Sequence, residues 1–227
     1  MSRYNMFNQI HKALRVLLYD TATLLGRTDF VDPDQLTAAT SRVKEVLDMF
    51  DGHANHEDGF VLPLITQYEP AVVDAFEQEH VMDHALGQKL RGSVMALELS
   101  VDFEAKQELG ISLMHSFIDF MVFNLNHMHK EETVLNNVLW KYYNDQTLLE
   151  TNQKIVQAIP PAEVAFASRW MMKALSDSEI VLWLRGVERN APRPVFNALF
   201  ATAEQQLDEI RFRKVLERLT EGVMIAS

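Results

Sequence analysis

The chain has 227 residues, enough for one large domain or for a compact domain with an appended region. Its formal charge of −11 argues against nonspecific nucleic-acid binding, because such binding needs clustered Lys and Arg to displace counterions from the phosphates. The sequence has no Cys, which excludes disulfides, thiolate metal sites and cysteine nucleophiles. A bound metal would therefore need nitrogen and oxygen donors.

The composition favours helices. Hydrophobic residues make up 48% of the chain, Gly and Pro number only 8 and 7, and Leu, Ala, Met, Glu and Gln recur throughout. We therefore expect an all-α protein. No apolar run reaches the roughly 18 residues of a membrane span, and the first residues do not resemble a signal peptide. A soluble cytoplasmic protein without a membrane partner is expected.

Four helices are predicted in the first 143 residues, each with an apolar stripe at three- and four-residue steps. The first carries His11 at the edge of its stripe. The second begins at Asp32-Pro33, an N-cap followed by the first helical position, and the third begins after Glu69-Pro70 and runs to about Leu99. The fourth follows Ser100-Val101-Asp102. In the last three helices, ionisable residues occupy stripe positions that are normally apolar: His53, Glu57, His80, His84, His127 and Glu131.

The predicted turns place these polar groups at similar depths. In antiparallel helices, residues equally distant from a turn lie at the same level. The midpoint between His11 and the 53/57 pair is residue 33, and the midpoint between that pair and the 80/84 pair is 68 to 69, so both coincide with turn signals. The third midpoint, 105 to 106, has no Gly or Pro, so the level of His127 is predicted only approximately.

Three of the groups are pairs with an i to i+4 spacing. Such residues lie about 40° apart around a helix, so each pair can direct two donors to one point. Imidazole and carboxylate donors suit iron, zinc or manganese, and seven donors exceed what one ion takes. The pattern therefore predicts two metal ions bridged by carboxylates. Burying these groups without metal would leave charges unpaired, at a cost of several kcal/mol per ion.

These residues resemble the hemerythrin-like HHE cation-binding family over roughly residues 1–143. The family pattern is a single His, then His-x-x-x-Glu, His-x-x-x-His, and a last His with a carboxylate four or five residues later. The chain matches it at seven positions: His11, His53, Glu57, His80, His84, His127 and Glu131. The last carboxylate could be Glu131 or Glu132. We favour Glu131, because it continues the apolar stripe of the fourth predicted helix.

The resemblance implies an antiparallel up-down four-helix bundle with a non-haem di-iron centre. Two Fe ions would be bridged by the two carboxylates and an oxo or hydroxo group. One iron would bind three His, and the other would keep an open position on its two-His side. Phenylalanines such as Phe7, Phe60, Phe76, Phe117 and Phe120 are expected to line the pocket. Reversible binding or sensing of a small diatomic, O2 or NO, is the leading hypothesis.

Two other functions stay open. One is a di-iron oxidase, a peroxide- or NO-detoxifying protein or an iron-handling protein, although the only Glu-x-x-His spacing near the site joins Glu77 to His80. The other is a non-catalytic helical interaction module. A metal- or oxygen-binding protein is favoured over an enzyme, and both interpretations stay open. Residues 144–227 are expected to form a helical extension without a comparable group, packed on the bundle or on a partner subunit in a homodimer.

The C-terminal extension has its own signals. Ser176-Asp177-Ser178-Glu179 is typical of a capping box before a helix. The basic residues Arg211, Arg213, Lys214 and Arg218 are interpreted as a solvated helix face.

Overall fold

The computed structural model describes residues 3–221. Met1, Ser2 and residues 222–227, at the outer ends of the predicted segments 1–143 and 144–227, lie outside the described residues. Within 3–221 the regular structure is entirely helical, so the all-α prediction is confirmed. No helix in this range combines the length and the apolar character that a membrane span needs.

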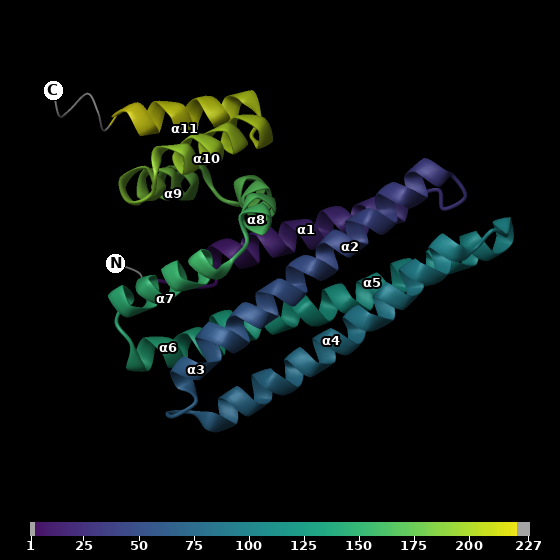
Figure 1. Cartoon of the computed structure of the whole chain (residues 1–227), viewed down its shortest axis with the longest axis horizontal. Helices are drawn as coiled ribbons and strands as arrows, with labels where there is room; N and C mark the ends of the chain where they lie inside the picture. The colour runs from purple at the N-terminus through teal and green to yellow at the C-terminus, as the bar shows by residue number, and fades with distance from the viewer. Residues whose placement is uncertain (1–2, 222–227) are drawn as a thin grey trace. The chain divides into compact units, whose positions relative to one another are not determined.

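The described helices follow one another with short connections (Figure 1). Their bounds are α1 Asn8–Arg27, α2 Pro33–His56, the π-helix η1 Glu57–Val61, α3 Leu62–Ile65, α4 Pro70–Leu99, α5 Phe103–Lys130, the π-helix η2 Glu131–Leu135, α6 Asn136–Tyr142, α7 Asp145–Ala158, α8 Pro161–Ala174, α9 Asp177–Asn190, α10 Arg193–Gln206 and α11 Glu209–Glu221.

The chain divides into two compact units. The first contains Leu17–Ala158 together with the residues up to Asn8, and the second contains Gln9–Val16 together with the residues from Ile159 onward. A homodimer contact through residues 144–227 stays a prediction.

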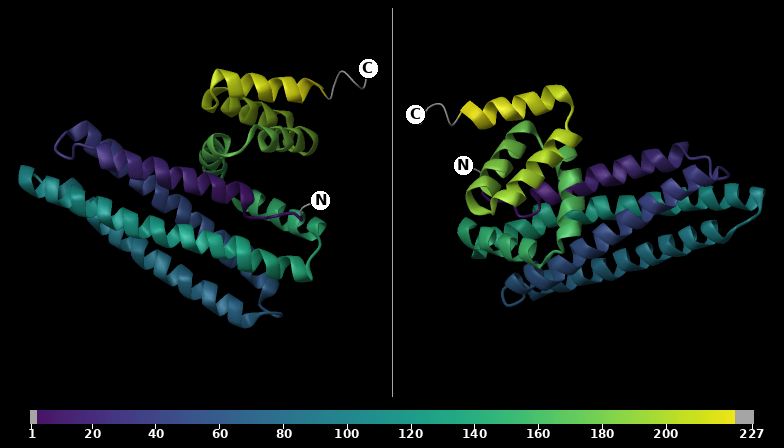
Figure 2. Two further views of the ribbon diagram at one scale, coloured as in Figure 1. Left: turned by 180° about the vertical axis from the view of Figure 1, so that it is seen from behind. Right: turned by 45° about the horizontal axis from the view of Figure 1, so that its top comes forward.

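The first unit is a helical bundle whose long helices lie side by side in both views of Figure 2. Helix α2 packs against α4, and α4 packs against α5. Asp32 caps α2 by accepting hydrogen bonds from the backbone N–H groups of Asp34 and Gln35, and α4 begins at Pro70, as predicted. Asp102 caps α5, so the third turn spans residues 100–102, a few residues before the midpoint of 105 to 106.

On α4 and α5 the buried residues follow an alternation of three- and four-residue steps. On α4 the buried residues are Val73, Phe76, His80, Asp83, Gly87, Leu90, Val94 and Leu97. Helix α5 repeats the alternation from Gly110 through Leu113, Phe117, Phe120 and Asn124 to His127, and Ser116 and Met128 beside it are also buried. A 3.5-residue apolar repeat is the pattern of helices that pack side by side at a small crossing angle, because it keeps one seam facing the partner. Polar residues on these seams are therefore forced into the interior.

Two glycines in the long helices should respond oppositely to alanine. A Cβ on Gly110 would lie 2.2 Å from Cδ2 of the Phe30 ring, whereas one on Gly92 meets nothing within 4 Å. We expect Gly110→Ala to lower the free energy of unfolding by about 1–3 kcal/mol through overpacking. Gly92→Ala should raise it by up to about 1 kcal/mol, because alanine favours helix. Urea unfolding of both variants checks this, and a neutral Gly110→Ala would contradict the close packing.

The second unit has its own core, built by α8 to α11. Buried residues from these helices form one cluster: Met172, Leu175, Ile180, Val181, Leu184, Leu199, Ala203, Leu207 and Val215. The predicted capping box is confirmed, since Ser176 accepts a bond from the Glu179 N–H and the Glu179 carboxylate accepts one from the Ser176 N–H.

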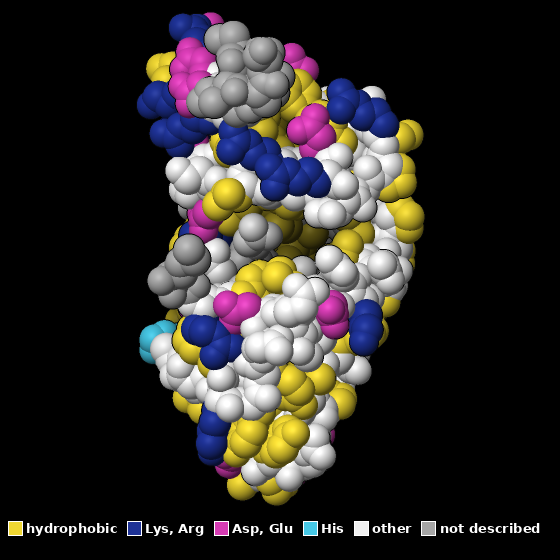
Figure 3. All heavy atoms as spheres, turned by 90° about the vertical axis from the view of Figure 1, so that its left-hand side faces the viewer, with side chains coloured by type: hydrophobic (Ala, Val, Ile, Leu, Met, Phe, Trp, Pro, Cys, Tyr) yellow, Lys and Arg dark blue, Asp and Glu magenta, His cyan; other side chains and the backbone are white. Residues whose placement is uncertain are grey.

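The basic residues of α11 are partly used inside the second unit. Arg211 donates to Asp177 at 2.8 Å and to the Leu175 carbonyl at 2.6 Å, and Arg218 donates to the Ser178 hydroxyl at 3.0 Å. On the face in Figure 3, Lys and Arg side chains gather in the upper part of the view with acidic side chains among them. Arg213, Lys214 and Arg218 are exposed, in agreement with a solvated helix face, whereas Arg211 is half-buried.

Candidate metal centre

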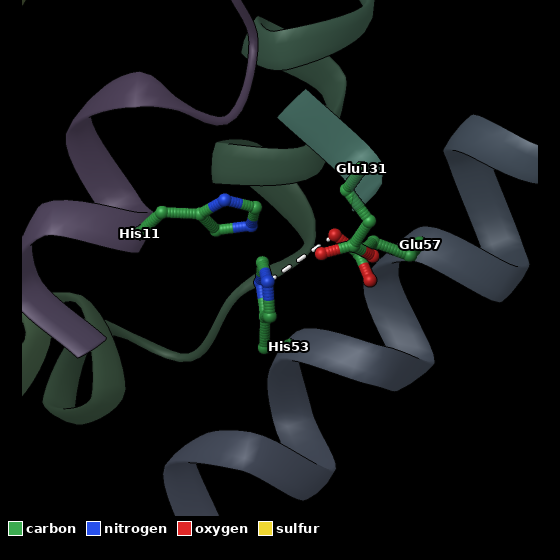
Figure 4. Close-up of side chains that lie close together, drawn as sticks. All are labelled: His11, His53, Glu57 and Glu131. Carbon is green, nitrogen blue, oxygen red and sulfur yellow. Dashed lines mark ion pairs between the residues drawn. The ribbon is translucent and has the colours of Figure 1, made fainter. Parts of the chain in front are cut away.

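Six of the seven predicted ligands lie in two overlapping groups. The donor atoms of His11, His53, Glu57 and Glu131 are all within 4.8 Å of one another, and the four side chains point toward one another in Figure 4. A second group, with the same limit on its distances, contains Glu57, His80, His127 and Glu131. Because both groups contain Glu57 and Glu131, these carboxylates lie where two ions could share them.

The two His-x-x-x-Glu pairs have nearly the same geometry. Nε2 of His53 is 3.2 Å from Oε1 of Glu57, and Nε2 of His127 is 3.1 Å from Oε1 of Glu131. The pairs lie on α2 and α5 and continue into η1 and η2. The single histidines His11 and His80 lie on α1 and α4. The described site is therefore a duplicated pattern, in which each half has one single histidine and one His-x-x-x-Glu pair.

Both shared glutamates begin a π-helix. The Leu62 N–H donates to the Glu57 carbonyl and the Asn136 N–H donates to the Glu131 carbonyl, so each bond spans five residues instead of four. Short π-helices are rare and occur often at functional sites. In η1 the sequence gives a local reason, because Pro63 would clash with the carbonyl of residue 59 in a regular α-helix. Neither η2 nor the helix α6 directly after it contains a proline, so the sequence gives no such local reason for the second π-helix.

Two histidines of the second group are oriented by further carboxylates. The rings of His80 and His127 approach each other through their Nε2 atoms at 3.1 Å. On the opposite side, Nδ1 of His80 is 2.7 Å from Asp58 and Nδ1 of His127 is 2.9 Å from Glu79. A carboxylate that accepts from Nδ1–H fixes the tautomer that leaves Nε2 available to a metal. Asp58 and Glu79 are not among the residues that the sequence predicts for the site, although each is adjacent to a candidate ligand.

Removing either orienting carboxylate should weaken metal binding. We expect Asp58→Ala and Glu79→Ala to reduce metal affinity by about 10- to 100-fold, with smaller losses for Asp58→Asn and Glu79→Gln, whose amide oxygens still accept. Competition with a chromophoric chelator measures this. The control is Asp74→Asn, because Asp74 is an exposed carboxylate on α4 outside both groups. Unchanged affinity in both alanine variants would contradict the orienting role.

The carboxylates also alter the protonation of the imidazoles. Burial disfavours the charged form of His80, but Glu57 and Asp58 outweigh burial and raise the pKa of its imidazole to about 9. The pKa of His127 is also raised, against the effect of burial, by Glu131 and Glu79. Without metal, the charged imidazoles of His80 and His127 thus balance the carboxylates around them, and a bound cation would replace their protons.

The remaining predicted ligand, His84, is in neither group. Its side chain is exposed, and its Nε2 lies 3.4 Å from Nε2 of Gln88. The alternating seam of α4 passes from His80 to Asp83 and then to Gly87, so residue 84 falls outside it. Glu131 is buried and belongs to both groups, whereas Glu132 belongs to neither. Alternating three- and four-residue steps along α4 lead from residue 80 to residues 83 and 87. This pattern in the sequence is the signal by which a buried Asp83 and an exposed His84 could have been predicted.

Asp83 and Asn124 form a buried polar pair beside the site. Nδ2 of Asn124 donates to Oδ1 of Asp83 at 2.6 Å and to the Phe120 carbonyl at 3.1 Å. Burial raises the pKa of Asp83, and the bond from Asn124 opposes that effect. Neither Asp83 nor Asn124 is among the residues that the sequence predicts for the site. The pair connects α4 to α5 one turn from His80 and His127.

Of the predicted aromatic lining, Phe76 lies against the site. Its ring packs edge-on to His127 with 5.7 Å between centroids. Phe123, which was not predicted, stacks nearly parallel to the same imidazole at 6.1 Å.

The donor set fits a pair of borderline divalent ions. Imidazole nitrogen and carboxylate oxygen are the donors that iron, zinc and manganese take in proteins. The four residues of the second group have exposed fractions of 8% or less, and their donor atoms lie within 4.8 Å of one another. Two carboxylates among imidazoles from separate helices are costly to bury unless a cation compensates them.

Comparisons with known proteins agree with this geometry. The family model for the Hemerythrin HHE cation binding domain matches residues 2–139. No curated protein and no solved structure matches the chain. The matched region contains all six residues of the two groups and covers more than half of the chain. The chain therefore belongs to the hemerythrin HHE cation-binding domain family.

Proposed function

We propose that this protein holds two iron ions in the bundle and reversibly binds or senses a small diatomic molecule, O2 or NO. The observation that carries the proposal is the overlap of two donor groups at Glu57 and Glu131. A carboxylate common to two groups is what a pair of closely spaced ions requires. His11 and His53 would bind one ion, and His80 and His127 the other.

The donor count leaves room for an external ligand. Each group offers two imidazoles and the two shared carboxylates, so four side chains serve each ion. Iron in such sites takes on the order of six donors and keeps open positions where the protein supplies fewer. When bound, the iron pair would supply the redox-active centre for a diatomic ligand. The protein's residues hold the metals, orient the imidazoles through Asp58 and Glu79, and keep bulk water away through Phe76 and Phe123.

One observation favours a second candidate function. With His84 exposed, the groups contain four histidines and two glutamates, a smaller nitrogen share than the five histidines of the sequence-based prediction. A lower nitrogen share brings the site nearer to carboxylate-type centres that consume O2 or peroxide. The buried Asp83 beside the site adds another carboxyl group.

Metal analysis and spectroscopy separate these functions. Protein from iron-replete expression should contain about two iron ions per chain. Anaerobically reduced protein mixed with O2 or NO should change its absorption spectrum, and removing the gas should restore the original spectrum. Irreversible oxidation with continuing O2 or peroxide consumption would support the second candidate. Fewer than one metal ion per chain would contradict both and favour the interaction module.

A further inference from the structure

A small cavity opens beside the second donor group. It has a volume of about 280 Å³ and lies between the first turns of α4 and the region where α5 passes into η2. We name it the α4–η2 cavity. Its lining residues are Ala71, Val72, Ala75, Phe76, Glu79, Lys130 and Val134.

Only one layer of side chains separates the α4–η2 cavity from the site. Phe76 lines the cavity and packs its ring edge-on against His127, while Glu79 lines it and lies 2.9 Å from Nδ1 of His127. Phe76 is 5% exposed, so its ring covers the imidazole on this side. A larger cavity of about 440 Å³, lined by Arg3 and residues 141–145, includes no residue of either donor group.

The walls of the α4–η2 cavity select for neutral molecules. Ala71, Val72, Ala75 and Val134 offer only apolar side chains. The two charged lining residues bind each other, with Nζ of Lys130 2.6 Å from Oε1 of Glu79, so neither charge is left to attract an ion. A water molecule takes about 30 Å³ of liquid volume, so the cavity holds a molecule of a few heavy atoms.

We propose that the α4–η2 cavity is the opening through which a small neutral molecule reaches the His80 and His127 side of the candidate centre. This inference rests on the proposed function and specifies the path by which the small molecule reaches the candidate centre. The buried donors need such a route, because Glu57, His80, His127 and Glu131 are each 8% exposed or less. Such a route requires movement of the Phe76 ring, because this ring lines the cavity and packs against the imidazole of His127.

The first test uses the metal-free protein and xenon, a neutral apolar probe that occupies cavities of this kind. Xenon should shift the amide NMR signals of residues 71–79 and 130–134. Ala75→Phe, which fills the cavity, should abolish these shifts. The matched control Ala85→Phe, at an exposed position on the same helix outside the lining, should preserve them. Absence of shifts in the unaltered protein would overturn the inference whatever the metal content.

The second test uses the iron-loaded, reduced protein and stopped-flow mixing with O2 or NO. Ala75→Phe should slow association and dissociation by at least about tenfold each, while iron content and Kd stay unchanged, because a narrower route alters rates and not the equilibrium. Val134→Phe narrows the opposite wall and should act alike. Ala85→Phe should match the unaltered protein. Unaltered rates in both cavity variants would overturn the inference.

The two failures are distinguishable. If the unaltered protein gives no gas-dependent spectrum, the proposed function fails, and the xenon shifts still decide whether neutral molecules occupy the cavity. If the spectrum appears and the cavity variants do not slow it, the function stands and the route is wrong.

Discussion

Replacing His80 with glutamine is expected to remove most bound metal, whereas the same replacement at His84, four residues further along α4, should leave metal binding intact. His80 is buried, with Nε2 3.5 Å from Glu57 and 3.1 Å from Nε2 of His127. His84 is exposed and belongs to neither donor group. The comparison is matched because the two substitutions are identical and lie on one helix.

Thermal unfolding should report the same contrast. A metal that binds only the folded state stabilises it by RT ln(1 + [L]/Kd), about 2.7 kcal/mol at a hundredfold excess over Kd. His84→Gln should therefore keep the full rise in melting temperature on metal loading, and His80→Gln should lose most of it. Metal content after desalting provides the second measurement. Equal loss of metal from both variants would restore the His-x-x-x-His pair of the sequence-based prediction.

The second large effect is a pair of opposite pH dependences: the stability of the metal-free protein should fall with rising pH, whereas its apparent affinity for metal should rise. In the metal-free protein the pKa of His80 is raised from 6.5 to about 9, against burial, by Glu57 and Asp58. A raised pKa stabilises the fold fully below pH 6.5, and this contribution is lost as pH rises through about 9. The shift corresponds to about 3 kcal/mol at most. Metal-free protein should thus become less stable between pH 6.5 and 9.

Metal binding should change in the opposite direction, because an imidazole must lose its proton before it coordinates. The apparent metal affinity should rise up to about pH 9, roughly tenfold per pH unit for each proton displaced. Chelator competition and urea unfolding at several pH values measure the two trends. His80→Gln, which lacks the titrating group, serves as the control and should show a flatter profile in the metal-free state. A metal-free protein that gains stability from pH 6.5 to 9 would contradict the raised pKa.

The local signals in the sequence were reliable where the chemistry is local. Asp32 and Asp102 cap helices through their own carboxylates, and Pro70 begins α4 because proline suits a first helical turn. The His-x-x-x-Glu spacing of the 53/57 and 127/131 pairs fixed their common face, since a helix sets the angle between residues four apart.

The i to i+4 rule was insufficient for α4. His80 and His84 point in directions about 40° apart around the helix axis. A helix can therefore bury one of them at the edge of its core face and leave the other outside it. Which edge faces inward depends on the contacts of α4 with α2 and α5, and these contacts bury Asp83 instead of His84. Orientation of a helix about its own axis is a tertiary property.

The sequence by itself determined the helical class, the starts of the main helices and six side chains that the structure brings together in two donor groups, because these follow from periodicity, capping and pair spacing along a single helix. Only the tertiary structure decided that two donor groups share Glu57 and Glu131, that Asp58 and Glu79 orient the imidazoles, and that both glutamates begin π-helices. Each of these depends on contacts between residues far apart in the chain or on backbone hydrogen bonds that the periodicity of side chains does not record.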